Sequence, residues 1–373
     1  MINRPDCCMC HGALITKSLI PHLPVFASSV TQDFQEDLFA DQIWGECISC
    51  GLIQLMKLVP LDVLYSQNHN AEVVGATWSS HHEEFAKFIL SHEPRKILEI
   101  GASHEYLSQL LTAKKEDLIY TVIDPNLGGV ESPRITRITG FIEDYLEILY
   151  GCDIVMSHVL EHIYKPGDFL DNLARNLRVG DRLFLSTPQI YEWLKLRSPN
   201  ALNFEHTYYL NMAQIITHLE NLGVHLIQHS RYLRHSEFTV FLKTQSLPKI
   251  CKVFVESEKR KKEFQLFILE TKDFCNGLND FLEKEDSKVY LYGASLFSQI
   301  LVGMGFKESF ALGVIDNAST KWGQRLYGSH LIVSPVSILD TTVPENVVLK
   351  MGPYQDEIRK QILRINPRVR LFE

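Results

Sequence analysis

The chain has 373 residues, of which 45% are hydrophobic and 22% are charged, and its formal net charge is −8. This length allows two or three domains with ample cores. The modest negative charge gives no sign of nucleic-acid or membrane binding, and no apolar run is long enough to span a bilayer. The opening residues, MINRPDCCMC, lack the apolar core of a signal peptide, so we expect a cytoplasmic protein.

Cysteines concentrate near the start of the sequence. Five of the eight lie within residues 7–50, and four of these five form two CxxC pairs. Two such pairs can supply the four thiolates of a closed tetrahedral zinc site, and clustering in a cytosolic protein favours a metal over disulfides. Residues 1–60 are therefore expected to be a zinc-binding domain; the alternative is four buried thiols that bind no ion. The predicted ligands of this structural Zn²⁺ are Cys7, Cys10, Cys47 and Cys50.

The next segment, residues 61–94, has the pattern of a helical connector. It contains the stretch WSSHH, in which His81 and His82 could form a metal pair. A solvated helix face is the favoured interpretation of the two histidines, because a pair alone leaves a metal site incomplete.

Strand-like and helix-like segments alternate from residue 95 to residue 246. The strand-like segments are, in chain order, RKILEIG, LIYTVIDP, ITRITGFI, CDIVMSHV, DRLFLSTP, VHLIQHSRYL and EFTVFLKT. The first five are short, apolar and rich in β-branched residues, as strands buried on both faces of a parallel sheet should be. The last two are close enough to form a hairpin. We therefore predict an α/β domain with a seven-stranded, doubly wound, Rossmann-like sheet that closes with an antiparallel pair.

The remaining sequence divides into a helical linker at residues 247–286 and a second, smaller α/β unit at residues 287–373. In the second unit, YGAS follows a strand-like segment and VIDNAST ends the next one. The backbone N–H groups of Gly293 and Ser295, at the start of the following helix, could bind a phosphate. A plain Rossmann-like turn is the alternative.

Three features of the central domain locate a ligand of the nucleoside type, all at the carboxyl ends of strands, where open α/β sheets bind ligands. The first strand ends in Glu99 and Gly101, and the second ends in Asp124, which could hold a ribose diol. The third leads into GFIED, where Phe141 and Glu143 could flank an adenine. Asp124 alone could be a turn acid before a proline. Together, the three features and the closing hairpin indicate a class I methyltransferase that uses S-adenosylmethionine.

The loop after Gly101 lacks the further glycines of a nucleotide-binding loop. Ser103 is expected to be the N-cap of the following helix, and Glu105 is expected to project to solvent from its first turn. We therefore expect this loop to bind S-adenosylmethionine less tightly than a glycine-rich loop would.

Five stretches resemble motifs of one family, the sugar C-methyltransferases of deoxysugar biosynthesis, and the similarity spans nearly the whole chain. CISCGLIQL resembles the second zinc knuckle of that family, and SHVLEHIYKPGDFL resembles its motif after the fourth strand. NFEHTYYLN resembles its Glu-His motif, and VYLYGASLFSQILV with VIDNASTKWGQRLYG resembles its C-terminal sugar-nucleotide domain. The loop from Ser103 to Glu105 departs from the family pattern, and Asn203 or Phe204 stands where the family has a tyrosine.

The resemblance implies a C-methylation in which a base removes a proton next to a ketone of a nucleotide-linked deoxysugar. On the matching positions, His206 is the expected base, Glu205 its orienting partner or an enolate contact, and His162 a second donor. A helix-start histidine with no catalytic duty is the alternative for His162. Tyr65 is the nearest candidate for the tyrosine of the connector. The resemblance adds Ser157 and His158 to the cofactor residues, and Asp316 and Lys321 to the sugar-nucleotide residues.

Two other functions stay open. One is methyl transfer to an oxygen or nitrogen of a sugar, and the other is a catalytically silent protein that binds a sugar nucleotide. The expected partner is a nucleotide sugar, with no nucleic acid and no membrane, and the expected assembly is a monomer or a small homo-oligomer.

Overall fold

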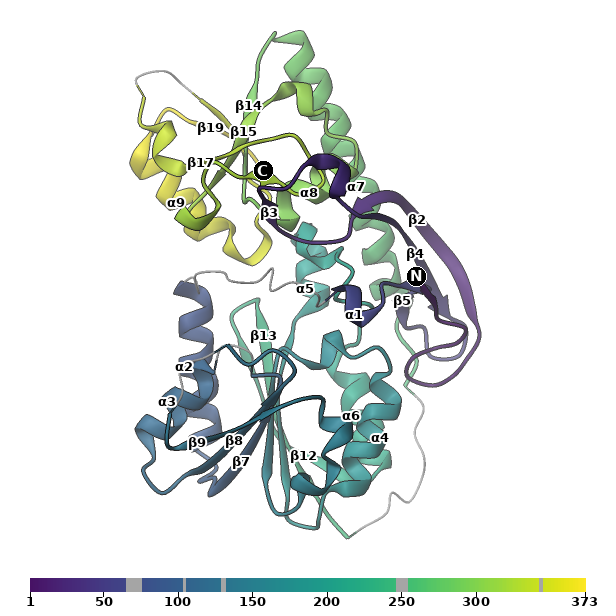
Figure 1. The fold of residues 1–373 in the computed structure, drawn as a ribbon. Helices are drawn as coiled ribbons and strands as arrows, with labels where there is room; N and C mark the ends of the chain where they lie inside the picture. The colour runs from purple at the N-terminus through teal and green to yellow at the C-terminus, as the bar shows by residue number, and fades with distance from the viewer. Residues whose placement is uncertain (65–75, 103–104, 129–131, 246–253, 342–344) are drawn as a thin grey trace.

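The structure is a computed structural model that describes residues 1–64, 76–102, 105–128, 132–245, 254–341 and 345–373 (Figure 1). Its central part is a seven-stranded sheet with the order β12-β13-β11-β10-β7-β8-β9. The strands are β7 (Lys96–Ile100), β8 (Ile119–Asp124), β9 (Ile135–Thr139), β10 (Asp153–Ser157), β11 (Arg182–Pro188), β12 (Val224–Tyr232) and β13 (Ser236–Lys243). Strands β7 to β11 are mutually parallel, and β13 runs antiparallel to both of its neighbours. This is the class I methyltransferase arrangement, so the fold predicted from the sequence is confirmed.

Helices cover both faces of this sheet. The helices are α2 (Ala76–Leu90) and α3 (Tyr106–Lys114) on one face, and α4 (Pro166–Asn176) and α6 (Met212–Asn221) on the other. Adjacent residues of one strand serve different faces: Val155 packs with α2 and α3, whereas Ile154 packs with α4 and α6. Burial on both sides explains why the inner strands β7, β10 and β11 are largely apolar, whereas the edge strands β9 and β12 carry exposed polar residues. The strand order reverses between β7 and β10, and at such a point open α/β sheets bind ligands beyond the carboxyl ends of the strands.

The N-terminal part is an antiparallel sheet that continues into the central domain. It consists of β2 (Leu14–Pro24), β4 (Phe39–Cys47) and β5 (Ile53–Leu55), flanked by the short pair β1 (Ile2–Asn3) and β6 (Lys57–Leu58). Gln54 of β5 forms an antiparallel bridge with Tyr208. The Leu55 amide donates to the Thr207 carbonyl at 2.8 Å, and the Tyr209 amide donates to the Ile53 carbonyl at 2.9 Å. Residues 207–209 of the central domain thus act as one more strand of the N-terminal sheet.

The C-terminal part holds a five-stranded parallel sheet with the order β17-β15-β14-β18-β19. Its strands are β14 (Val289–Tyr292), β15 (Ala311–Asp316), β17 (Val333–Pro335), β18 (Asn346–Val348) and β19 (Arg370–Phe372). Its helices are α8 (Leu296–Gly303) and α9 (Gln355–Ile365), and the long helix α7 (Glu258–Lys284) precedes it. Two short helices, α1 (Leu61–Leu64) and α5 (Ile190–Lys195), lie near the middle of the molecule (Figure 1).

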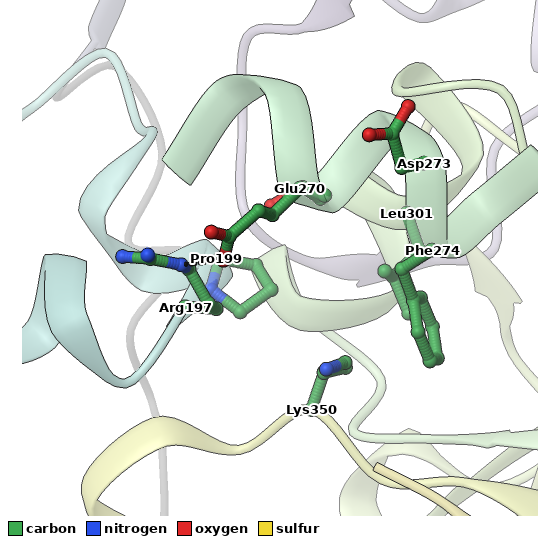
Figure 2. A pocket seen from close by; sticks show the side chains of 8 residues that line it. Arg197, Pro199, Glu270, Asp273, Phe274, Leu301 and Lys350 are labelled. Carbon is green, nitrogen blue, oxygen red and sulfur yellow. Dashed lines mark hydrogen bonds and ion pairs between the residues drawn. The ribbon is translucent and has the colours of Figure 1, made fainter. Parts of the chain in front are cut away.

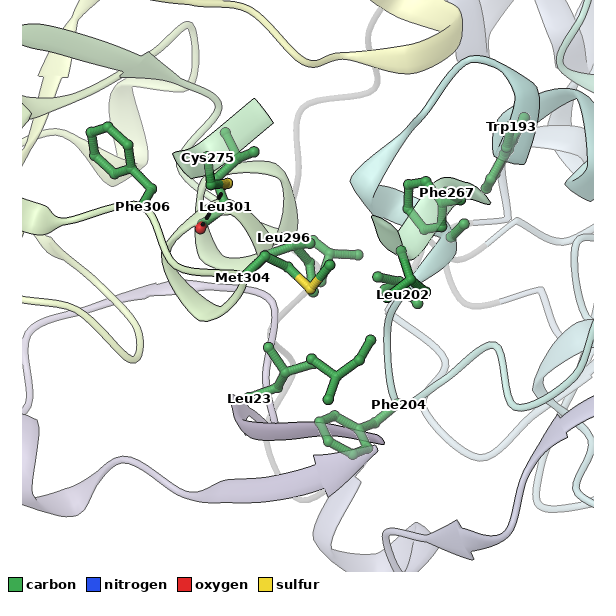
Figure 3. Packing of buried hydrophobic residues seen from close by; sticks show 14 of the residues in the cluster. Leu23, Trp193, Leu202, Phe204, Phe267, Cys275, Leu296, Leu301, Met304 and Phe306 are labelled. Atoms are coloured by element: carbon green, nitrogen blue, oxygen red, sulfur yellow. Dashed lines mark hydrogen bonds between the residues drawn. The ribbon is translucent and has the colours of Figure 1, made fainter. Parts of the chain in front are cut away.

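The N-terminal and C-terminal parts are joined directly. Strand β3 (Ser29–Val30) pairs with β16 (Arg325–Leu326). The Arg325 guanidinium donates to both carboxylate oxygens of the buried Asp37, at 2.7 and 2.9 Å. One apolar core is shared by all three parts: Leu23, Trp193, Phe267 and Met304 come from the N-terminal sheet, α5, α7 and the C-terminal unit (Figure 3). None of the helices in the described ranges combines the length and apolarity needed to cross a membrane.

Candidate active site

The carboxyl ends of β7, β8 and β10 bring the predicted cofactor residues to one edge of the sheet. Gly101 follows β7 with a φ of +78°, and a Cβ there would lie 2.3 Å from Val159 Cγ2. This turn therefore requires glycine. Asp124 is 8% exposed, and one of its carboxylate oxygens accepts a hydrogen bond from the Asn126 amide at 2.6 Å. Ser157 Oγ is buried and makes no hydrogen bond to the described residues, which leaves a polar atom at this edge for a ligand.

Glu99 lies beneath this edge instead of lining it. The side chain is buried, and the Tyr120 hydroxyl donates to Glu99 Oε2 at 2.9 Å. Burial raises the pKa of Glu99 to about 7, because a carboxylate without water around it is disfavoured.

The start of helix α3 corrects one expectation. Glu105, and not Ser103, occupies the N-cap position of α3, in the left-handed conformation with a φ of 52°. Its side chain is fully buried and lies 2.7 Å from the Arg137 guanidinium, so the expectation that Glu105 projects to solvent is wrong. Arg137 belongs to β9, and its ion pair with Glu105 holds this carboxylate inside the protein. Ser103 and Tyr65 lie outside the described residues.

The end of β9 presents side chains at the surface. Phe141 is 49% exposed, and Glu143 is also exposed in the 3-10 helix Ile142–Asp144. Ile142 between them is buried in the core. Phe141 and Glu143 are therefore both open to solvent at the end of β9.

The residues predicted for proton transfer lie together. His162 Nδ1 is 3.4 Å from Glu205 Oε2, and the rings of His162 and His206 meet edge to face with centroids 5.0 Å apart. His206 is 8% exposed, and its Nδ1 is buried with no hydrogen bond to the described residues. Burial lowers the pKa of His206 well below the usual histidine value, with His162 and His158 adding to the effect. Glu205 thus contacts His162, whereas the sequence motif predicts that it orients His206, and burial keeps His206 neutral.

The main chain around His206 is held from two sides. Asn203 Oδ1 accepts from the amides of Glu205 and His206, at 3.0 and 2.5 Å. Directly after His206, the bridge to β5 begins with Thr207. A cavity of about 20 Å³, large enough for one water molecule, lies between His206 and Glu161.

Three residues near this site were missed or misread in the sequence. Glu161 is buried, and burial raises its pKa to about 7. His235, in the turn between β12 and β13, is 1% exposed. His81 is completely buried and donates to or accepts from Ser186 Oγ at 2.8 Å, so the interpretation of a solvated helix face is wrong for His81. The hairpin and α2 pack over the sheet edge, a tertiary contact that a local pattern does not show.

The two CxxC pairs form a second candidate site, where the N-terminal sheet meets the central domain. One sulfur from each of the four predicted ligands lies within 4.8 Å of the others. The Cys7 and Cys50 sulfurs are 3.6 Å apart, and those of Cys10 and Cys47 are 3.5 Å apart. Four thiolates on one zinc ion at about 2.3 Å would be roughly 3.8 Å apart, so the donor set fits zinc. Cys8 lies outside this group.

The four residues predicted to bind the sugar nucleotide gather at the end of β14 and β15. Gly293 has a φ of +96°, and the next amide, of Ala294, donates to Asp316 Oδ2 at 2.7 Å. Lys321 Nζ is 3.9 Å from the same oxygen, and Ser295 is the N-cap of α8. Asp316 thus already satisfies one of the amides that could have bound a phosphate.

A larger pocket of about 280 Å³ opens between α7, the end of α5 and the segment after β18 (Figure 2). Arg197 pairs with Glu270 on one wall, and Lys350 Nζ lies 4.2 Å from the centroid of the Phe274 ring on the other. None of the predicted site residues lines this pocket.

No family model matches the chain, and no curated protein matches it. Solved methyltransferase structures are similar to it over less than half of its length. An O-methyltransferase family protein from Burkholderia thailandensis is 11% identical with a TM-score of 0.36, and the match covers 45% of this chain and 57% of that protein. Magnesium protoporphyrin IX methyltransferase from Synechocystis PCC 6803, solved with bound SAH, is 12% identical with a TM-score of 0.36, over 46% of this chain and 85% of that one. The chain thus spans just over half the length of the first of these relatives.

Proposed function

We propose that this protein is an S-adenosylmethionine-dependent C-methyltransferase that acts on a nucleotide-linked keto-deoxysugar. One observation carries the proposal: His206 is buried, neutral and without a partner at Nδ1, at the edge of a class I methyltransferase sheet. An unprotonated Nδ1 without a partner can take a proton from carbon. Because the lowered pKa makes this imidazole a weaker base than an exposed one, the developing enolate charge beside it would have to stabilise the imidazolium.

The cofactor would be held by Gly101, Asp124, Phe141, Glu143 and Ser157. The glycine turn lets the main chain come close to a ligand, and the Asp124 carboxylate can accept from both hydroxyls of a ribose. Ser157 Oγ would gain a hydrogen bond that it lacks among the described residues. When bound, S-adenosylmethionine supplies an electrophilic methyl group on a sulfonium ion.

The side chains around His206 supply the proton chemistry. His206 Nδ1 would take the proton from the carbon next to the ketone, and the carbon–hydrogen electron pair would become that of an enolate. His162, oriented by Glu205 at 3.4 Å, would donate a hydrogen bond to the enolate oxygen. His206 would then release its proton to solvent.

The two other parts of the chain would hold this centre in place and bind the rest of the substrate. Zinc at the four cysteines would have no open position for substrate, so its role would be structural. Gly293, Ser295, Asp316 and Lys321 lie together at the carboxyl edge of the C-terminal sheet, where they could contact the nucleotide of the sugar.

The test is proton exchange and methyl transfer on the same substrates. The protein is incubated in deuterated water with a panel of nucleoside-diphosphate-linked 4-keto-deoxysugars, with and without S-adenosylmethionine. We expect deuterium to enter the carbon next to the ketone, and methylation to follow at that carbon. His206→Gln should lower both rates by about 10²–10⁴-fold. His218→Gln is the matched control, because His218 pairs with Asp171 on α4, away from the proposed base.

Other outcomes select the alternatives. Methyl transfer to an oxygen or nitrogen of the sugar without deuterium exchange would contradict the carbanion mechanism. It would show that the oxygen or nitrogen attacks the methyl group directly. Binding of a sugar nucleotide without cofactor binding would favour a catalytically silent protein, an alternative that the buried Glu105 beside the cofactor loop supports.

A further inference from the structure

Three histidines outside the proposed proton-transfer residues meet behind the sheet edge. His81 comes from α2, His158 follows β10, and His235 lies in the turn between β12 and β13. One ring nitrogen from each lies within 4.8 Å of the other two. The ring centroids are 5.1 Å apart for His81 and His158, and 5.5 Å apart for each of the other two pairs. Three separate elements thus bring three imidazoles to one point.

Each ring has one nitrogen held by an oxygen of a surrounding side chain. His81 Nε2 is 2.8 Å from Ser186 Oγ, and His235 Nε2 is 3.0 Å from Tyr354 Oη. His158 Nδ1 is 3.0 Å from Glu161 Oε1. Metal-bound histidines are oriented in the same way, with the nitrogen that does not bind the ion held by a carboxylate or another oxygen.

The other ring nitrogen of each histidine has either a shared hydrogen-bond partner or none among the described residues. His158 Nε2 and His235 Nδ1 both contact Ser236 Oγ, at 2.8 and 2.6 Å. His81 Nδ1 is buried and makes no hydrogen bond to a described residue. A buried nitrogen without a partner is costly, and an ion at this point would satisfy it.

The surroundings define the chemistry of the ion. Trp78 closes the cluster with its ring edge-on or face-on to all three imidazoles, at centroid distances of 4.8 to 5.1 Å. The nearest carboxylate, of Glu161, contacts His158 and would act through that ring. Neutral nitrogen donors favour borderline transition metals such as zinc over magnesium or calcium.

We propose that His81, His158 and His235 bind a second divalent transition-metal ion, of the zinc class, separate from the four-cysteine site. The ion would take the place of the Ser236 hydroxyl, which can rotate away about its Cα–Cβ bond. It would tie α2, the end of β10 and the β12–β13 hairpin together beside the candidate active site. The inference does not rest on the proposed methyl transfer, because it needs only the three imidazoles and their partners.

Metal titration tests the proposal. Protein whose cysteine site has been filled with Zn²⁺ is titrated with Co²⁺, which reports its ligands through its absorption spectrum. We expect one further equivalent of Co²⁺ to bind with weak visible bands of nitrogen ligation and no thiolate-to-cobalt charge-transfer band. No spectral change, or a change that carries the thiolate band, would overturn the proposal in the unaltered protein.

Variants then assign the ligands. His81→Gln and His235→Gln should each reduce the bound Co²⁺ from about one equivalent to less than half, with zinc at the cysteines unchanged. His82→Gln is the control from the next position of α2, and it should bind as the unaltered protein does. Full Co²⁺ binding by both His81→Gln and His235→Gln would show that these histidines are a hydrogen-bonded core and not a metal site.

Discussion

Glu99, Glu105 and His206 are three of the ionisable side chains buried near the carboxyl edge of the central sheet. The protein accommodates them in different ways. Glu105 pairs with Arg137, Glu99 accepts from Tyr120, and His206 is kept neutral by burial. Burying ionisable groups costs free energy that burying apolar residues would not. We therefore expect these groups to be kept at this edge for a function and not for stability.

Glu99 predicts a measurable pH dependence of stability. Its pKa is about 7 in the folded protein and near 4.5 when exposed, so between these pH values the folded state binds more protons than the unfolded state. The free energy of unfolding should therefore fall as the pH rises from 4.5 to 7, by up to about 3 kcal/mol from this group, and change no further above it. Glu99→Gln has no carboxyl group to titrate at this position. Its free energy of unfolding should therefore fall less between about pH 5 and about pH 8 than that of the unaltered protein.

Urea unfolding of both proteins at the two pH values measures this difference. Glu116→Gln, at an exposed position, is the control and should behave as the unaltered protein does. An identical loss of stability for Glu99→Gln and the unaltered protein would show that Glu99 is ionised when folded.

Single residues also differ in whether a local sequence pattern can predict their place in the structure. Gly101 and Asp124 could be located because a strand followed by a turn has a recognisable pattern, and the four cysteines because their spacing is specific. Glu105 and His81 could not, because their burial depends on Arg137 and on the β12–β13 hairpin, which are distant in the sequence. A helix-start pattern in the sequence predicts that these side chains are exposed. In the folded protein, contacts with residues distant in the sequence bury them instead.

Among the elements, the junction between β5 and residues 207–209 matters most for the candidate site. It places His206 immediately before a strand that belongs to the N-terminal sheet. Arg4 secures this junction: its buried guanidinium donates to the carbonyls of Leu55, Thr207 and Tyr164, at 2.8 to 3.0 Å. The N-terminal sheet thus positions the proposed base.

Arg4→Ala should loosen that junction. The Leu55 and Tyr164 carbonyls would lose the Arg4 donor, and the Thr207 carbonyl would keep only the Leu55 amide. We expect the free energy of unfolding to fall by about 2–4 kcal/mol, since an unsatisfied buried group costs about 1–3 kcal/mol. Arg359→Ala is the control, because Arg359 pairs with Glu373 at the surface, where such pairs contribute little. Denaturant unfolding compares the two variants, and equal losses would show that Arg4 is not a structural link.

The elements themselves were largely predictable, whereas their junctions were not. The sequence predicts all seven strands of the central sheet. The inner strands β7, β10 and β11 are apolar runs bounded by turns, and the edge strands β9 and β12 are rich in residues that favour strands. Pairings such as β3 with β16, two residues long on each side, leave no periodic pattern in either segment. The two strands of this pair are also almost three hundred residues apart in the sequence.

At the scale of the molecule, the cysteine site lies against the central domain. The Gly167 amide at the start of α4 donates to the Cys8 carbonyl at 3.1 Å, and a Cβ on Gly167 would lie 2.8 Å from the Met9 carbonyl oxygen. The first cysteine pair therefore packs on α4 through its own backbone. An ion that orders this pair would also stabilise the contact with the central domain.

We predict that Cys47→Ser loses one equivalent of zinc per chain and has a lower melting temperature, because metal binding contributes directly to folding free energy. Cys8→Ser is the matched control: Cys8 is next to a predicted ligand but outside the group of four, so zinc should be retained. Elemental analysis and thermal melting of the two variants measure these effects. Equal zinc content in Cys47→Ser and the unaltered protein would contradict the assignment.

The central claim is that the edge formed by Gly101, Asp124 and Ser157 binds S-adenosylmethionine, and calorimetric titration tests it most directly. We predict micromolar binding to the unaltered protein. Asp124→Ala should bind about tenfold more weakly or worse, because a charge-assisted hydrogen bond contributes about 1.5–3 kcal/mol. Asp117→Ala, at an exposed position before β8, should bind as the unaltered protein does. No binding at millimolar cofactor, or equal binding by Asp124→Ala, would contradict the account.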